Sequence, residues 1–227
     1  GLFGVKALSK FGPVDVTTIA SIEKSKKEQS EWEGGGQSNK QQIRDVDWMK
    51  NRYFFIHPWF RNGVDTFATN VAYSIPSFYP LRNGLHLIGD VVVKNFELYK
   101  IDVSNNPQAD QGIAFINPNN QSQDSDKSKE GSFIRLQRGI DYIVNEDLGF
   151  IRMQNSLQNE IIATHFELYD RISGQLVYKV GEGINDQNQS LILKMIKAQS
   201  SHPNHPVWDL MFKNVYSIGS KNVDGES

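Results

Sequence analysis

The chain of 227 residues contains no cysteine. That absence excludes disulfide bonds, thiolate catalysis, iron–sulfur clusters and cysteine-ligated zinc sites. No apolar run approaches the roughly 18 residues that a membrane-spanning helix needs, so helical membrane insertion is excluded as well. The charge is not dominated by one sign, because 24 basic and 26 acidic residues leave a net charge of -2. This balance argues against a protein that coats nucleic acid or binds membranes through a polybasic surface.

The polar residues that are present are unusually rich in amides, with 19 Asn and 15 Gln. Such weakly charged surfaces are typical of long exposed loops. With 38% hydrophobic and 22% charged residues, the composition is nevertheless that of a folded chain. The length allows one large or two small domains. The chain starts at Gly1 with neither an initiator Met nor an apolar signal segment, so we expect a processed product or a fragment.

Two antiparallel ribbons are expected in the first 44 residues. Residues 2–23 alternate with period 2 on both sides of a Lys10–Pro13 turn, which predicts a hairpin. A polar ribbon is expected to follow, over 24–44, with Gly34–Gly36 interrupting it at the turn.

The densest aromatic cluster lies at residues 48–62. Pro58 at the first helical position and Gly63 just past the end predict a short helix over 58–62. A packed local core is the favoured interpretation, over a platform on which a ligand stacks. The aromatic residues chosen as structural or partner-contact candidates are Phe54, Phe55, Trp59, Phe60 and Trp208.

The remainder of the chain reads as mostly β. Residues 86–103 predict one or two strands, and the amide-rich stretch 104–132 predicts a mobile loop. Four strands with regular turns over 133–180 predict a small sheet or sandwich. Residues 191–197 fit either a buried strand or a short helix, and 208–218 alternate like a strand.

The residue patterns that carry chemistry are weak. His202, His205 and Asp209 include potential zinc ligands, but Pro203 and Pro206 prevent the helix that usually presents such a pair. No phosphate-binding loop, nucleophile elbow or pair of catalytic carboxylates is recognisable. We therefore expect no catalytic residues, no metal, no cofactor and no enzymatic activity.

Several segments together carry a resemblance to a known family. The most specific is Trp208–Ser217, preceded by Leu193–Lys197, and supporting segments are Gly1–Ala7, Phe11–Pro13, Asn51–Phe55, Trp59–Arg61, Arg138–Tyr142 and Gly149–Ile151. These segments resemble the SprA/Sov family. These matches run from residue 1 to about 219 in the order of the family, whereas 104–132 matches no pattern of the family.

The resemblance implies part of a giant outer-membrane β-barrel, the translocon of the type IX secretion system of Bacteroidetes, which exports folded proteins and in some species serves gliding motility. The implied partners are secreted cargo proteins, barrel-plugging or shuttle proteins, lipoproteins, the rest of the same barrel and the outer membrane, but no nucleic acid. Residues of about 24–207 would then be extracellular, because outer-membrane barrels have short periplasmic turns and long external loops.

The expected fold is therefore mainly β, with antiparallel outer-membrane barrel strands at both ends, about 2–23 and 208–219. Between them we expect a β-rich insertion with one or two short helices. The expected parts are a barrel hairpin (1–23), an exposed ribbon with the aromatic cluster and loop (24–132), a small β module (133–207), and a returning strand with a tail (208–227). The alternative is a soluble, surface-exposed β-sandwich that acts as an adhesin or carbohydrate-binding module.

Overall fold

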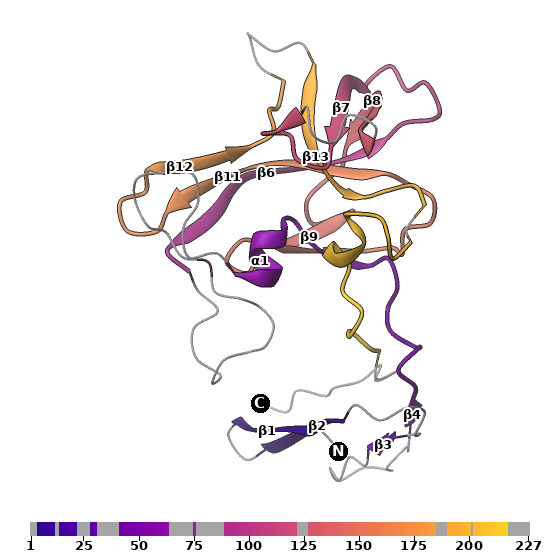
Figure 1. Cartoon of the computed structure of the whole chain (residues 1–227), viewed down its shortest axis with the longest axis vertical. Helices are drawn as coiled ribbons and strands as arrows, with labels where there is room; N and C mark the ends of the chain where they lie inside the picture. The colour runs from indigo at the N-terminus through magenta and orange to yellow at the C-terminus, as the bar shows by residue number, and fades with distance from the viewer. Residues whose placement is uncertain are drawn as a thin grey trace. The chain divides into compact units, whose positions relative to one another are not determined.

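The fold is mainly β, as expected, and divides into two compact units (Figure 1). A computed structural model describes residues 4–11, 14–21, 28–30, 41–63, 75, 89–121, 127–184, 190–200 and 202–217. The smaller unit comprises 1–48 and 216–227, and the larger one comprises 49–215. Among the described residues, no helix has both the length and the apolar character needed to cross a membrane.

The smaller unit contains two antiparallel strand pairs. β1 (Gly4–Phe11) pairs with β2 (Val14–Ser21), which confirms the expected hairpin. β3 (Glu28–Ser30) pairs with β4 (Gln41–Ile43), which confirms the pairing of the polar ribbon. The expected turn residues of both ribbons, Gly12 with Pro13 and Gly34–Gly36, lie outside the described residues.

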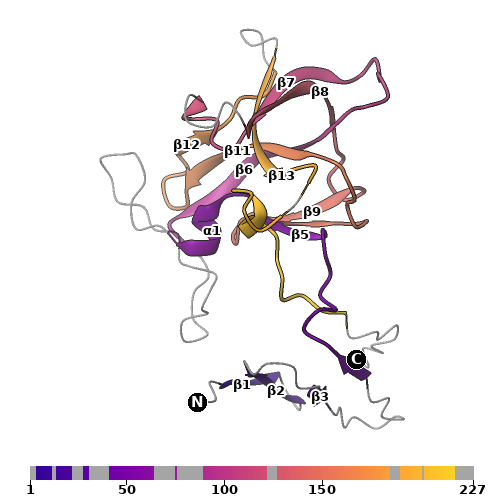
Figure 2. The ribbon, with the colours of Figure 1, turned by 45° about the vertical axis from the view of Figure 1, so that its right-hand side comes forward.

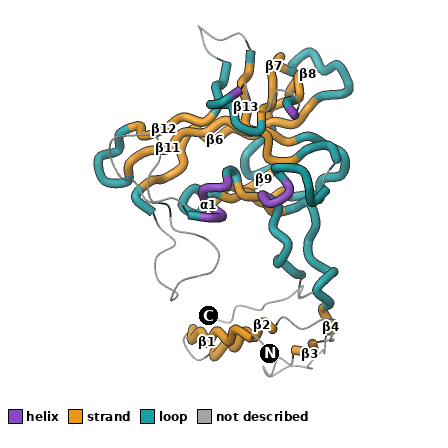
Figure 3. Tube along the Cα trace, in the orientation of Figure 1, coloured by secondary structure: helices purple, strands orange, loops and turns teal. Residues whose placement is uncertain are grey.

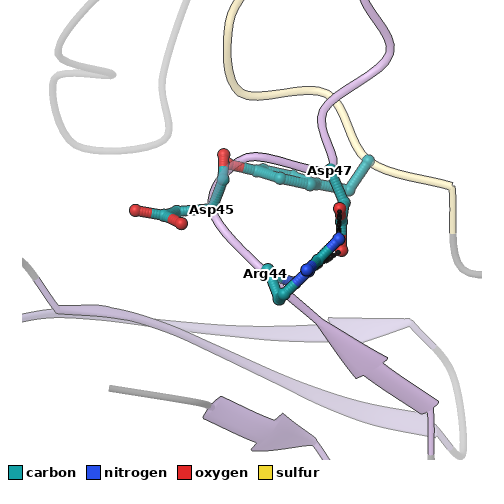
Figure 4. Close-up of polar contacts among 4 residues, drawn as sticks. Arg44, Asp45 and Asp47 are labelled. Carbon is teal, nitrogen blue, oxygen red and sulfur yellow. Dashed lines mark hydrogen bonds and ion pairs between the residues drawn. The ribbon is translucent and has the colours of Figure 1, made fainter. Parts of the chain in front are cut away.

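A tight turn follows β4 in the smaller unit (Figure 4). The guanidinium of Arg44 donates to both carboxylate oxygens of Asp47, at 2.8 and 3.0 Å, and these bonds lower the pKa of Asp47. The side chain of Asp45 points away from this pair, while its carbonyl accepts a hydrogen bond from the Tyr216 hydroxyl at 3.0 Å. The ion pair is exposed, so it orders the turn but adds little stability.

The larger unit is built on a six-stranded sheet with the order β12-β11-β13-β7-β8-β6. β6 also pairs with β11, so β6, β8, β7, β13 and β11 form a closed ring of five strands. Only β7 and β13 run parallel, and every other pairing in this sheet is antiparallel. The strands are β6 (Val91–Ile101), β7 (Asp110–Phe115), β8 (Lys129–Arg135), β11 (Ile162–Asp170), β12 (Leu176–Val180) and β13 (Leu191–Lys197).

The ring closes because β11 pairs with two different strands, β13 and β12, along one of its edges. Its first residues pair with β13, and residues from Phe166 onward pair with β12, while its other edge pairs with β6 along nearly its whole length. Register shifts accompany all three pairings, and such irregularities bend a strand. The core residues with almost no exposed surface include Leu98, Ala114, Phe133, Phe166 and Leu193.

A second sheet of three antiparallel strands has the order β5-β10-β9. Its two outer strands, β5 and β9, are labelled in Figure 2. The three strands are β5 (Tyr53–Phe55), β9 (Tyr142–Asn145) and β10 (Phe150–Met153). Helix α1 (Pro58–Asn62) follows β5, which confirms the expected helix. His57 caps its N-terminus, because its Nδ1 accepts a hydrogen bond from the Trp59 amide at 3.3 Å, and Gly63 ends it with a φ of 80°.

The strand expected at 208–219 is wrong over the residues that the structure describes. Trp208–Leu210 form a short 3-10 helix, η3, and the chain to Ser217 contains no strand (Figure 3). The alternation failed as a signal because Leu210, Met211 and Phe212 are all buried, one after the other. Met211 forms an isolated bridge with Phe54. Leu210, Met211 and Phe212 therefore lie in the core of the larger unit, with Met211 and Phe212 against β5.

The mobile loop expected at 104–132 is also wrong, because it contains β7 and the start of β8. The short apolar run Ile113–Ile116 was its only strand-like feature, and its parallel partner β13 lies about 80 residues further along the chain. A pairing between strands so far apart in the sequence produces no pattern within either strand that identifies its partner. The expected division at 132/133 falls inside β8, and 191–197 is resolved as a buried strand.

Candidate functional site

The candidate site begins with a β-bulge in β6. Asn95 and Phe96 lie between the residues paired with Glu167 and His165, so two residues of β6 face a single residue of β11. Asn95 adopts a left-handed conformation with a φ of 48°, and its amide donates to Glu167 at 2.6 Å. A bulge shifts the side-chain alternation of its strand. Phe96 packs edge-on against Tyr142 of β9, with ring centroids 5.7 Å apart.

A closed turn between β8 and β9 supplies the second part of the site. The carboxylate of Asp141 accepts a hydrogen bond from the Gln137 amide at 2.7 Å, and the Asp141 amide donates to the Gln137 carbonyl at 2.8 Å. Gly139 has a φ of 86° and donates to the Tyr142 carbonyl at 2.8 Å. These bonds hold the backbone on both sides of Arg138. The positive φ falls on Gly139, where the absence of a Cβ makes it tolerable.

The bulge and the turn border an open pocket of about 460 Å³, whose lining residues are Phe96, Arg135, Leu136, Gln137, Arg138 and Tyr142. An aromatic pair forms its apolar part, and two guanidinium groups with one amide form its polar part. None of the six lining residues is a histidine, a carboxylate or a hydroxyl nucleophile other than the phenol. The pocket therefore offers mainly hydrogen-bond donors around an aromatic pair.

Tyr142 is the only buried residue among the polar residues that line the pocket. Its side chain is only 2% exposed, and its hydroxyl has no hydrogen-bond partner among the described residues. Among the described residues, Arg152 Nε is the one side-chain nitrogen or oxygen that is both fully buried and without a hydrogen-bond partner. Since the Tyr142 hydroxyl also has no partner but is not fully buried, it is still in contact with solvent. Burial raises the pKa of Tyr142, while the positive charges of Arg138 and Arg135 oppose that rise. The phenol is thus protonated and available as a donor.

Two ion pairs hold the arginines in place. Arg135 lies 2.8 Å from Glu97, and Arg138 lies 2.6 Å from Glu146. Glu97 also accepts a hydrogen bond of 2.6 Å from the Tyr99 hydroxyl, and burial together with this bond raises the pKa of Tyr99. Each arginine remains more than half exposed. Because a guanidinium has five N–H donors, both arginines keep further donors for a ligand.

The aromatic candidates from the sequence lie elsewhere. Phe54, Phe55 and Phe60 are buried, as expected of a packed core. Trp59 is half-buried, with its ring 3.8 Å from that of His57 and 5.3 Å from that of Tyr178. Trp208 is also half-buried, and the ammonium of Lys213 lies 4.9 Å from its ring centroid. The structure brings none of the five candidates into the pocket.

The histidines considered as zinc ligands have other interactions. The rings of His202 and His205 are 5.8 Å apart, and His205 Nδ1 accepts a hydrogen bond from the Val207 amide at 3.3 Å. Asp209 pairs with Lys213 at 2.9 Å. Across the described parts of the chain, no group of three or more metal-ligating side chains converges.

Sequence reasoning missed the pocket, although one signal pointed near it. Arg138–Tyr142 had stood out as a family-like segment, yet nothing local connects it to Phe96. The bulge on β6 and the pairing of β6 with β8 bring them together. Comparison with known proteins adds no assignment, since neither a protein-family model nor a curated protein significantly matches the chain.

Proposed function

We propose that the chain is a non-enzymatic part of a SprA/Sov-type translocon in the outer membrane, through which folded proteins reach the cell surface. In this proposal β1 and β2 belong to a membrane barrel, and the larger unit is a folded element on the extracellular side. The proposal includes no returning strand at 208–217, because Trp208–Leu210 form a 3-10 helix and Leu210, Met211 and Phe212 are buried in the larger unit.

The observation that carries the proposal is the register of the β1–β2 hairpin. Residues directly opposite each other in an antiparallel pair lie on the same face. The register places Lys10 opposite Asp15 and Lys6 opposite Ile19, so all three charged positions of the hairpin share one face. The positions on the other face are Val5, Ala7, Ser9, Phe11, Val14, Val16, Thr18 and Ala20. Such alternation of an uncharged and a charged face is typical of transmembrane barrel strands.

The larger unit lends support of a different kind. Two segments that resemble the family, Asn51–Phe55 and Trp208–Ser217, are far apart in the sequence but adjacent in the fold. The Phe212 amide donates to the Tyr53 carbonyl at 2.9 Å, and the Phe212 ring lies 4.2 Å from that of Phe55. Tyr53 and Phe55 of the first segment and Phe212 of the second thus pack together in one structural element.

Cysteine labelling tests this proposal, because the chain has no cysteine of its own. Single cysteines at Val103 and Ile172, both almost fully exposed, should react with a membrane-impermeant maleimide on intact cells. A cysteine at Gly12 should react only after lysis, because the short hairpin turn would face the periplasm. If intact cells are labelled at Gly12 and at neither of the other two positions, the orientation in the membrane is the opposite of the proposed one. Recovery of the native protein in the detergent-free soluble fraction would refute the barrel.

The second candidate is a soluble, surface-exposed adhesin or carbohydrate-binding module. The pocket favours it, because a binding module requires a site on a self-contained fold and the larger unit has its own core. Detergent dependence separates the two candidates. A binding module stays monomeric in buffer, whereas a chain with exposed barrel strands aggregates without detergent.

A further inference from the structure

We propose that the pocket between β6, the end of β8 and β9 binds the side-chain carboxylate of an acidic residue in an extended peptide. This inference goes beyond the translocon role and does not depend on it, because it concerns only the larger unit. The pocket is defined by the six lining residues given above.

The polar groups of the pocket consist mainly of donors. The Tyr142 hydroxyl has no partner among the described residues and can donate, and the guanidiniums of Arg135 and Arg138 each use only part of their N–H groups on Glu97 and Glu146. The amide of Gln137 adds two further donors and the one side-chain oxygen that only accepts. An excess of charged and neutral donors selects a ligand rich in acceptors, and a carboxylate provides two oxygens that accept bidentate bonds from arginine.

The surroundings of the pocket favour a peptide as the source of that carboxylate. Ile140, at the tip of the turn, is 68% exposed, and Ile143, next to Tyr142, is 44% exposed. β9 is the last strand of the three-stranded sheet, but its outer edge at Tyr142 is already bridged by Arg138 of the same chain, so a bound peptide would contact side chains rather than pair with this strand. Ile143 lies on the face of β9 opposite to Tyr142, so an apolar side chain next to the acidic residue would cover Ile140. The proposed ligand therefore has an acidic residue beside an apolar one.

Binding of a matched peptide pair to the full chain tests the inference. The probe is a synthetic pentapeptide, Gly-Leu-Glu-Leu-Gly, with blocked ends so that Glu carries its only carboxylate, and the control peptide has Gln instead of Glu. By calorimetry or NMR titration, we expect the Glu peptide to bind at least about tenfold more tightly, because hydrogen bonds to a charged group are the stronger ones. Equal affinity for both peptides would refute the inference.

Protein variants locate the site. Tyr142→Phe removes only the hydroxyl, and Arg138→Gln removes one guanidinium; each should weaken binding of the Glu peptide by roughly three- to tenfold. Arg44→Gln is the matched control, because Arg44 is also exposed, pairs with a single carboxylate and does not line the pocket. It should leave the affinity unchanged, and thermal unfolding verifies that each variant is folded.

Two outcomes would overturn the assignment. Equal losses in Arg138→Gln and Arg44→Gln would indicate non-specific charge attraction. Tighter binding of free glucuronic acid than of the Glu peptide would show that the pocket prefers acidic sugars to acidic peptides. Neither outcome bears on the cysteine-labelling test of the translocon, so the two proposals fail separately.

Discussion

At the scale of single residues, Phe54 and Trp208 show how similar aromatic side chains come to have different roles. Phe54 is 1% exposed and lies on β5, while Trp208 is half-buried beneath Lys213. We expect Phe54→Ala to lower the free energy of unfolding by about 3–5 kcal/mol, because it leaves a cavity. Trp208→Ala should cost only about 1–2 kcal/mol. Denaturant unfolding measures both, and equal losses would contradict the placement of Trp208.

His57 gives the larger unit a dependence on pH. Burial, and to a lesser degree the positive charge of Lys194, hold the pKa of His57 well below its usual 6.5. In the unfolded chain the imidazole takes up a proton as the pH falls through 6.5, whereas the folded state resists it. Protonation would also occupy Nδ1, which caps helix α1. Stability should therefore be complete above pH 7 and decline below about 6.5, until the lowered pKa of the folded state is reached.

The variant His57→Asn isolates this effect, because asparagine still caps a helix but does not titrate. The free energy of unfolding of the native chain should fall between pH 7.5 and 5.5, and that of the variant should fall less. Urea unfolding at both pH values measures the difference. If the two proteins have parallel pH profiles, His57 is not the group responsible.

At the scale of elements, the parallel contact between β7 and β13 depends on a residue without a side chain. Gly112 lies opposite Leu191, and a Cβ at Gly112 would come within 2.6 Å of the Leu191 Cβ and 2.8 Å of its carbonyl oxygen. Gly112→Ala should therefore push the two strands apart and cost at least about 2 kcal/mol. Amide hydrogen exchange should become faster in β7 and β13.

The matched control is Gly139→Ala in the turn next to the pocket. A Cβ at Gly139 would meet nothing within 4 Å, so only its left-handed backbone is strained, at a cost of about 1 kcal/mol. Exchange in β7 should not change in this variant. If Gly139→Ala proves the more damaging of the two, close approach of the strands is not what requires Gly112.

At the scale of the whole molecule, the larger unit should fold without the smaller one. Its ring of five strands leaves few unpaired edges, and its core residues come from within 49–215. A chain of residues 49–215 should unfold cooperatively and remain monomeric in buffer, as calorimetry and gel filtration would show. Aggregation or a gradual transition would mean that this unit requires the rest of the chain.

Local patterns were sufficient wherever the interactions are local. The β1–β2 hairpin, helix α1 with Pro58 and Gly63, and the pairing of β9 with β10 all involve neighbours in the sequence. Periodicity and turn residues report such neighbours directly. The same patterns failed at 208–217 and at 104–132, because alternation does not reveal which distant partner buries a residue.

The sequence by itself determined the mainly β class, the cysteine-free chemistry and the local ribbons, since these follow from composition and from contacts between neighbours. Only the tertiary structure decided the closed ring, the pocket and the burial of Lys197. From its residue type alone, Lys197 would be expected at the surface, because lysine is rarely buried. In the structure its ammonium donates to the carbonyls of Gln158, Glu160 and Ala198 at 2.7, 2.9 and 3.1 Å. Hydrogen bonds between distant segments depend on how the chain closes on itself, and no local pattern encodes that closure.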